Sequence, residues 1–255
     1  MKHFTADFET ATWLKDETFV WAWATCDIET EKIELGNNID SFIEFCKNEK
    51  NSVFLFHNLK FDGEFIIYWA LTHGFKHVQN KEDIKDNTFT TLISDLGQFY
   101  SITLYYKKDK NKHVHKTTFL DSLKVINMSV KEIAKTYGLE ISKLEIDYNA
   151  PRKRGHILTE QEQDYIKNDV LIVAKALNIL YKNDLKKMTA ASNALNDYKE
   201  IISRGRFQHF FPLLDKNVDN DIRQAYKRGI HIFKPYIQRK NSRRRKRARC
   251  KFIIP

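Results

Sequence analysis

The first residues in this chain that indicate a chemical activity are two acids near its start. Asp7 and Glu9 stand two residues apart in the run FTADFETATW, residues 4–13, which reads as a β-strand. Side chains at positions i and i+2 of a strand point to the same face of the sheet. Two carboxylates so placed raise each other's pKa unless a cation lies between them. The pair predicts a bound cation, although an Asp-x-Glu pair on its own more often belongs to a solvated strand face.

Two further acids fall beside predicted elements. Asp62 follows the apolar strand SVFLFHN, residues 52–58, and Asp169 lies in a long helix. Carboxylate oxygens are the ligands that Mg²⁺ and Mn²⁺ prefer. Two such ions, about 3.5–4 Å apart, stabilise the attacking and leaving oxygens of a phosphoryl displacement. We therefore expect Asp7, Glu9, Asp62 and Asp169 to form a two-metal site for Mg²⁺ or Mn²⁺.

A tyrosine accompanies the last of these acids. Tyr165 precedes Asp169 by four residues, so both side chains share one face of the helix. A tyrosine hydroxyl beside a metal ligand can orient the attacking water or accept its proton. Taken alone, this spacing is a weak signal, because a packed helix residue would show it too.

The hydrophobic pattern predicts an α/β fold with a mixed β-sheet flanked by helices. Thr159 and Glu162 have the spacing of a capping box, which predicts the start of the long helix. We expect strands at residues 2–9, 19–28, 31–36, 52–58, 89–94, 98–106 and 113–121, and helices at 40–49, 62–74, 130–138, 160–181, near 189–204 and near 215–228.

The net charge of +10 resides in the C-terminal tail. Residues 234–251 contain ten Lys or Arg residues and no acid, which leaves 33 basic and 33 acidic residues elsewhere. The overall charge is therefore no guide to the partners of the folded part.

The segments that would direct a chain to a membrane are not apparent. The N-terminus lacks the apolar stretch of a signal peptide, and the longest apolar run, residues 65–71, is too short to span a bilayer. The three cysteines form no C-x-x-C pair, so we expect reduced thiols. These features predict a cytoplasmic protein without a membrane partner.

Three motifs follow one another along the chain, namely DFET at 7–10, HNLKFDGEF at 57–65 and YIKND at 165–169. In this order they resemble the exonuclease motifs of family B DNA polymerases, most of all the protein-primed branch of small phages and linear plasmids. Three other segments also resemble that family, namely DSLK at 121–124, KLEIDY at 143–148 and KKMTAASNAL at 186–195. The resemblance covers about residues 1–230. It implies an RNase H-like (DnaQ-like) fold and a 3′→5′ proofreading exonuclease that acts on the 3′ end of single-stranded DNA.

The resemblance also implies roles for single residues. It makes Asp7, Glu9, Asp62 and Asp169 the metal ligands and gives Tyr165 the task of orienting water. Lys143 matches a catalytic lysine, whose ammonium would stabilise charge on the scissile phosphate.

A further set of polar and aromatic residues matches those that hold the single-stranded 3′ end in that family. Their amide and hydroxyl groups suit phosphate and sugar, and their aromatic faces suit stacking on bases. Two members, Phe61 and Leu123, would also suit an apolar core. The set consists of Thr10, His57, Asn58, Phe61, Ser122, Leu123 and Tyr148.

The family pattern breaks near Tyr226. The family has a Tyr-x-Gly-Gly linker there, but this chain has Arg228 in place of the first glycine, and the acidic motifs of the polymerase palm do not follow. We expect the exonuclease domain at 1–190, the beginning of the palm and linker at 191–232 and a disordered basic tail at 233–255. The chain alone is not expected to polymerise DNA. A terminal protein primer would bind through the remainder of the polymerase.

Alternatives remain open for the tail and for the whole chain. The tail is either a basic arm that adds salt-sensitive DNA affinity or the product of a shifted reading frame, which we favour. Translation of the other two frames would reveal family-like sequence opposite residues 229–255 if the frame has shifted. The chain as a whole would otherwise be a free-standing carboxylate–metal nuclease acting on RNA or DNA, or a non-catalytic DNA-binding module.

Overall fold

The computed structural model describes residues 1–14, 17–106, 115–148 and 150–225. These residues belong to two compact units, Met1–Asn196 and Asp197–Pro255, which are called unit 1 and unit 2 below. The predictions for the tail at 233–255 and for the linker at Arg228 lie outside the described residues.

Unit 1 is built on one mixed sheet of eight strands in the order β3-β2-β1-β4-β8-β7-β6-β5. Strands β1, β4 and β8 are parallel neighbours, whereas β2 and β7 run antiparallel to the strands beside them. The predicted α/β fold with a mixed sheet is thereby confirmed. The strands are β1 (His3–Thr10), β2 (Val20–Asp27), β3 (Ile33–Gly36), β4 (Val53–Phe56), β5 (Lys76–His77), β6 (Thr88–Ile93), β7 (Phe99–Tyr105) and β8 (Lys116–Asp121).

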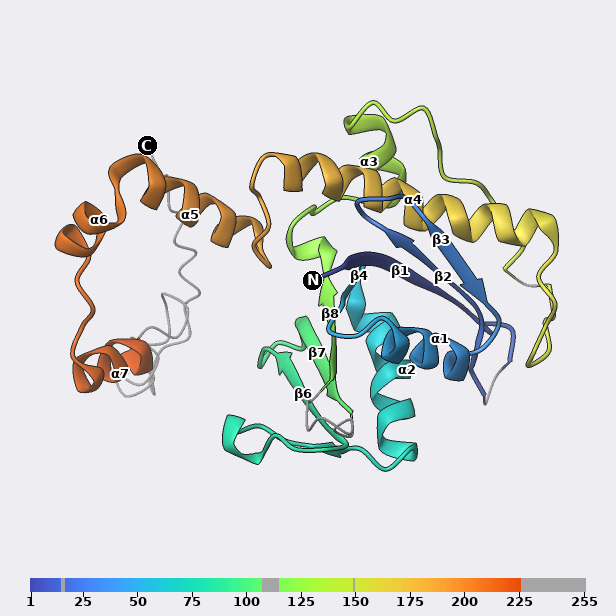
Figure 1. Ribbon diagram of the computed structural model, residues 1–255, viewed down its shortest axis with the longest axis horizontal. Helices are drawn as coiled ribbons and strands as arrows, with labels where there is room; N and C mark the ends of the chain where they lie inside the picture. Colours follow the sequence, from blue (N-terminus) through green and yellow to red (C-terminus); the bar gives the residue numbers. More distant parts are fainter. Residues whose placement is uncertain (15–16, 107–114, 149, 226–255) are drawn as a thin grey trace, which may run out of the picture. The chain divides into compact units, whose positions relative to one another are not determined.

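Helices cover both faces of this sheet (Figure 1). Helices α1 (Ile39–Asn48) and α2 (Leu59–Thr72) pack on one face, where the core is rich in phenylalanine rings. Helices α3 (Val130–Thr136) and α4 (Glu160–Lys182) pack on the other face against aliphatic residues and Trp21. Because both faces are covered, even β2, the second strand from one edge, contains only buried residues.

The two helices that carry predicted site residues begin in different ways. Helix α4 begins with the expected capping box, because the Thr159 hydroxyl accepts from the N–H of Glu162 and the Glu162 carboxylate accepts from the N–H of Thr159. Helix α2 begins at Leu59, three residues before the expected start at Asp62. The turn into it is made by Asn58 in the left-handed conformation, φ 85°, which asparagine tolerates better than most residues.

Other elements differ from the expectation in small ways. Strand β5 and two short 3-10 helices, η1 (Lys81–Asp83) and η2 (Ser122–Lys124), were not predicted. Strand β8 begins at Lys116, and the first expected residues of that strand, 113 and 114, lie outside the described part. Among the described residues, no helix has the length and apolar character that a bilayer crossing requires.

The described part of unit 2 is helical. Helix α5 (Ala190–Ile202) continues into it from unit 1, and α7 (Lys216–Ala225) agrees with the second predicted stretch as far as the described residues extend. The short helix α6 (Arg204–Phe210) was not predicted, and its N-cap Ser203 accepts a hydrogen bond from the N–H of Arg206. The rings of Tyr198 and Phe207 meet edge to face at 6.2 Å. Whether residues 191–232 are the beginning of a palm stays a prediction.

Candidate active site

The predicted motifs meet at the carboxyl ends of the three parallel strands. The sheet register places Ala6 of β1 beside Phe56 of β4, and Phe56 beside Asp121 of β8. The residues that follow these three are Asp7, His57 and Ser122. Ligands of α/β proteins commonly bind beyond the carboxyl ends of parallel strands. Asp7 and His57, which are 50 residues apart, and His57 and Ser122, which are 65 residues apart, thus become neighbours.

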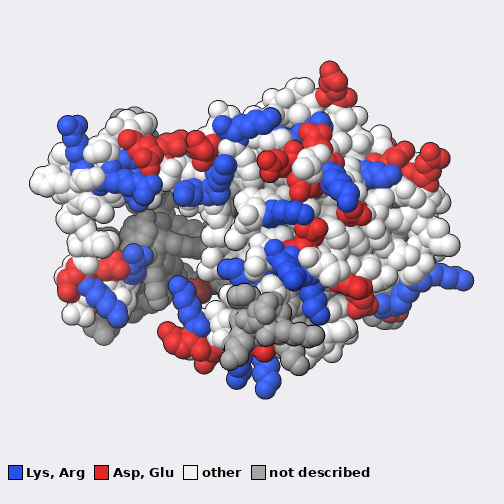
Figure 2. All heavy atoms as spheres, in the orientation of Figure 1, with Lys and Arg blue, Asp and Glu red and all other residues white. Residues whose placement is uncertain are grey.

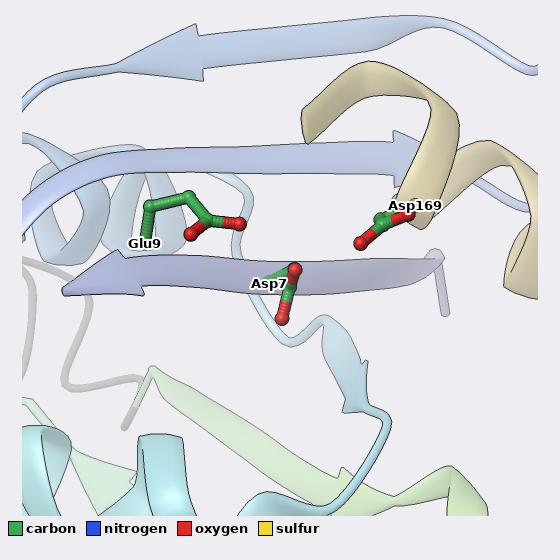
Figure 3. Close-up of side chains that lie close together, drawn as sticks. All are labelled: Asp7, Glu9 and Asp169. Carbon is green, nitrogen blue, oxygen red and sulfur yellow. The ribbon is translucent and has the colours of Figure 1, made fainter. Parts of the chain in front are cut away.

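Three carboxylates form a close group at this edge. Asp7 and Glu9 of β1 lie near Asp169 of α4 (Figure 3), and one carboxylate oxygen of each of the three lies within 4.8 Å of those of the other two. A cavity of about 130 Å³ adjoins them and is lined by Asp7, His57, Lys143 and Asp169, among others. The expectation that Asp7 and Glu9 share one face is confirmed.

The fourth predicted ligand, Asp62, lies outside this group of three. It belongs to the first turn of α2 and is 4% exposed. Burial raises its pKa well above the ordinary value, and the charge of Asp7 raises it further. Asp62 therefore feels the charge of Asp7, although its carboxylate is not one of the three that lie within 4.8 Å of one another.

All of these carboxyl groups are costly to ionise without a counterion. Burial is the main reason that the pKa of Asp7 is raised, followed by the charge of Asp169. Burial and then the charge of Asp7 raise the pKa of Glu9. Burial also raises the pKa of Asp169, against the opposing effect of its hydrogen bond with Lys143. Such mutual repulsion is relieved by a proton or by a cation bound among them.

Lys143 supplies one positive charge to the site. Its Nζ donates a hydrogen bond to Asp169 Oδ2 at 2.6 Å and lies 5.4 Å from the centre of the Tyr165 ring. Burial alone would lower the pKa of Lys143, but the hydrogen bond to Asp169 and the charge of Asp169 raise it overall. Lys143 is therefore a permanently charged ammonium at neutral pH.

Tyr165 faces the site with its hydroxyl group paired to another tyrosine. The hydroxyl oxygens of Tyr165 and Tyr148 lie 2.5 Å apart, and the ring of Tyr165 is buried. Burial raises the pKa of Tyr165, and the charge of Glu9 raises it further. The Tyr165 hydroxyl therefore stays neutral, so it is suited to hold a water molecule rather than to remove a proton as a phenolate.

His57 is bonded to protein atoms through both ring nitrogens. Its Nε2 lies 2.7 Å from the carbonyl oxygen of Met128, and its Nδ1 lies 3.0 Å from the hydroxyl of Ser122. A carbonyl can only accept, so Nε2 carries a proton that it donates to Met128. Burial lowers the pKa of His57, which keeps the ring neutral. The Ser122 hydroxyl, which is fully buried, also lies 3.1 Å from the carbonyl oxygen of Phe56.

The other residues predicted to hold a DNA strand lie around the same edge. Phe61 and Tyr148 are each 49% exposed, whereas Leu123 is half-buried and Thr10 is buried at the end of β1. Asn58 is exposed at the start of α2. Their role in holding a DNA strand stays a prediction.

Two structural residues of the site were not predicted. The buried carboxylate of Asp121 accepts from the N–H groups of Asn58 and Leu123 at 3.1 and 3.0 Å, so it fixes two turns that carry predicted strand-binding residues. Arg152 is 7% exposed and binds Glu162 in α4. Asp121 was visible as the first residue of the DSLK segment, but Arg152 gave no signal in its basic run.

Comparison with known proteins identifies the family to which the chain belongs. The model of the family described as DNA polymerase type B, organellar and viral, matches residues 43–158 and 149–244. The chain belongs to this family. The match extends beyond residue 230, where the resemblance was expected to end.

Within the family, the chain corresponds to the N-terminal part of the protein-primed phage DNA polymerases. It is 41% identical over 230 residues to the DNA polymerase of Bacillus phage B103, which is 90% of this chain and 39% of that polymerase. It is 39% identical over 230 residues to that of Bacillus phage phi29, with the same coverage. It is 30% identical over 241 residues to that of Streptococcus phage Cp-1, 87% of this chain and 38% of that polymerase. The chain thus spans about two fifths of their length.

Solved structures show the same relationship. The phi29 DNA polymerase complexed with single-stranded DNA aligns with a TM-score of 0.79 and 38% identity, over 89% of this chain and 39% of that one. Its complex with primer-template DNA aligns with a TM-score of 0.78 at the same identity and coverage. The predicted RNase H-like exonuclease fold is confirmed.

Proposed function

We propose that unit 1 hydrolyses the 3′-terminal phosphodiester of single-stranded DNA in a reaction that depends on Mg²⁺ or Mn²⁺. The observation that carries this proposal is the close group of Asp7, Glu9 and Asp169 at the carboxyl ends of the parallel strands. A solvated strand face, the common setting of an Asp-x-Glu pair, would leave such acids apart and exposed.

The residues present fit divalent metal ions. The carboxylate oxygens Asp62 Oδ1 and Asp169 Oδ1 are buried and have no hydrogen-bond partner among the described residues. Buried polar atoms without partners are rare in folded proteins, and here they lie beside like charges. Asp7, Glu9, Asp62 and Asp169 would hold the ions through oxygen ligands, the kind that Mg²⁺ and Mn²⁺ prefer. Bound ions supply Lewis acidity and a more acidic water molecule.

The chain's own residues contribute charge and orientation. The Lys143 ammonium lies beside the three carboxylates and donates one hydrogen bond to Asp169. It could donate a second one to a phosphate oxygen that gains charge during hydrolysis. The neutral Tyr165 hydroxyl orients a water molecule toward the phosphate. Its partner Tyr148 fixes the direction of that hydroxyl, because the two oxygens are within hydrogen-bonding distance.

The surrounding side chains suit a single strand better than a duplex. The exposed ring of Phe61 stands one residue before Asp62 and can stack on a base near the scissile bond. Acidic and basic side chains are interspersed over the face shown in Figure 2, so local contacts to phosphate and base would hold the strand. The solved complex of the phi29 polymerase with single-stranded DNA supports this class of ligand.

The activities of the whole relatives are proposals for this chain as well. They are DNA polymerisation in phage replication, priming by a terminal protein, and action in the host cytoplasm, since the chain spans only about two fifths of the relatives' length. The proofreading role follows from the same setting, because a 3′→5′ exonuclease removes the nucleotide that a polymerase has just added.

A digestion of matched DNA and RNA oligonucleotides tests the proposal. Each oligonucleotide carries a 5′ label and a free 3′ hydroxyl, and its last linkage is either a phosphodiester or a phosphorothioate that blocks hydrolysis. The proposal predicts a ladder of products shortened one nucleotide at a time from unblocked DNA, and slower degradation of blocked DNA. Faster cleavage of RNA than of DNA, or internal cuts that ignore the block, would contradict it.

A further inference from the structure

Two residues of the site, Lys143 and Tyr148, come from a segment between α3 and α4 without helix or strand in its described part, residues 139–148 and 150–158. A segment of this kind cannot fix its side chains through a backbone ladder. Side-chain contacts must hold it instead. Beside Lys143, the Asn168 amide of α4 donates to the carbonyl of Ser142 at 3.0 Å.

Beside Tyr148, the segment is held by hydrogen bonds from Arg152. Its Nη1 donates to the carbonyl oxygens of Asp147 at 2.7 Å and of Ala150 at 3.0 Å. These carbonyls flank Tyr148 on either side in the sequence. The guanidinium group thus closes the segment into a loop around the tyrosine that touches Tyr165.

The same guanidinium group is tied to the body of unit 1. Its Nε donates to Glu162 Oε1 in the first turn of α4 at 2.7 Å. It also lies 4.4 Å from the centre of the Trp21 ring of β2 and 5.9 Å from that of Trp13. Arg152 therefore joins the loop, the sheet and the helix that carries Tyr165 and Asp169.

Its partner Glu162 is itself held rigidly. One oxygen accepts from Arg152, and the other accepts from the N–H of Thr159 at 2.9 Å and lies 2.7 Å from His156 Nε2. Arg152 and Glu162 are both buried. A buried ion pair with most of its hydrogen bonds satisfied fixes geometry better than an exposed pair does.

We propose that Arg152 is a positioning residue of the active site: by clamping the backbone on both sides of Tyr148 to Glu162 of α4, it holds the Tyr148 hydroxyl against that of Tyr165. This inference rests on the proposed nuclease function. The planar fork of the guanidinium group makes bonds in several directions at once and stacks on tryptophan, which a lysine ammonium cannot reproduce.

The test compares Arg152→Lys with Arg154→Lys in the full chain. Arg154 is the matched control, because it belongs to the same loop, pairs with Glu17 and stacks over Phe19, but is exposed. Single-turnover cleavage of labelled single-stranded DNA should slow about tenfold in Arg152→Lys, since small displacements of positioning groups are costly. Arg154→Lys should cleave at the parental rate.

A double-variant comparison separates positioning from general stability. If Arg152 acts through Tyr148, the same Arg152→Lys change should slow the Tyr148→Phe variant by less than about threefold. An equal loss in both backgrounds, or parental cleavage by Arg152→Lys, would overturn the proposal.

Hydrogen exchange of the chain without DNA gives a readout that needs no activity. Amides of residues 141–148 should exchange about tenfold faster in Arg152→Lys than in the parent or in Arg154→Lys, while amides in the middle of α4 stay unchanged. Unchanged exchange at 141–148 would overturn the clamp. If the parent chain cleaves no DNA, the proposed nuclease function is contradicted. The exchange rates at 141–148 then test by themselves whether Arg152 holds this segment.

Discussion

Lys143 and Asp169 are joined by a 2.6 Å hydrogen bond between Nζ and Oδ2, although they lie 26 residues apart. The bond holds the ammonium of an irregular loop against α4, the helix that supplies the third of the three clustered carboxylates. It also explains how a lysine can be ordered beside a site that would otherwise contain only negative charge. In the proposed reaction, Lys143 would thereby lie where charge develops on the phosphate.

The first prediction concerns that ammonium. Lys143→Met keeps most of the unbranched side chain but removes its charge, so the rate of single-turnover cleavage should fall about a hundredfold. The control is Lys175→Met, because Lys175 lies in the same helix as Asp169 and pairs with Glu31 at the surface. A loss smaller than about threefold in Lys143→Met would remove the lysine from the mechanism.

The second prediction concerns the hydroxyl of Tyr165. Tyr165→Phe keeps the buried ring, so the fold and the affinity for single-stranded DNA should remain, while the cleavage rate drops about tenfold or more. Tyr181→Phe is the control, since Tyr181 also belongs to α4 but packs on His3. Parental cleavage by Tyr165→Phe would mean that this tyrosine only packs.

The third prediction is a pH dependence of stability without metal. Because burial raises the pKa of Asp7 and Glu9, folding favours their protonated forms. This contribution to stability is fully present below about pH 4, the ordinary carboxyl range, and is lost as the pH rises through the raised values. In EDTA, the free energy of unfolding of the parent should therefore fall by at least about 1 kcal/mol toward pH 8, relative to Asp7→Asn/Glu9→Gln.

Divalent metal provides the second half of that experiment. Mg²⁺ that binds only the folded chain should restore the stability of the parent at pH 8 and leave the double variant unchanged. If the free energy of unfolding changes with pH equally in the two proteins in EDTA, folding does not raise the pKa values of Asp7 and Glu9.

The fourth prediction concerns the single strand. Phe61→Ala should weaken binding of a short single-stranded DNA by about tenfold, which corresponds to the loss of one stacked base. Tyr68→Ala is the control, because Tyr68 is an exposed aromatic residue of the same helix, two turns farther from the site. Equal losses in a fluorescence anisotropy titration of both variants would place the strand elsewhere on α2.

The sequence predicts the parts of the site that depend on local periodicity. Strand alternation alone placed Asp7 and Glu9 on one face, and helical spacing placed Tyr165 beside Asp169. The start of α4 followed from the capping box of Thr159 and Glu162. Such features need only the regular geometry of one element.

Features that depend on contacts between distant elements could not be derived in this way. The role of Asp121 arises from the register of β8 against β4, which brings it to the turn at Asn58. Arg152 stands in the run RKR, which resembles an exposed basic surface, yet it is buried between two tryptophans and Glu162. The meeting of the acids was expected from their residue types and from the family resemblance, not from the periodicity of any one element.

The central claim is that the carboxylate group is a metal-dependent catalytic site. It is tested most directly by cleavage of 5′-labelled single-stranded DNA by the parent and by Asp7→Asn/Glu9→Gln, each with Mg²⁺, with Mn²⁺ and with EDTA. The account predicts shortening from the 3′ end by the parent with either metal, none in EDTA, and at least about a thousandfold slower cleavage by the folded double variant. Cleavage by the double variant within about tenfold of the parent, or equal cleavage in EDTA, would contradict it.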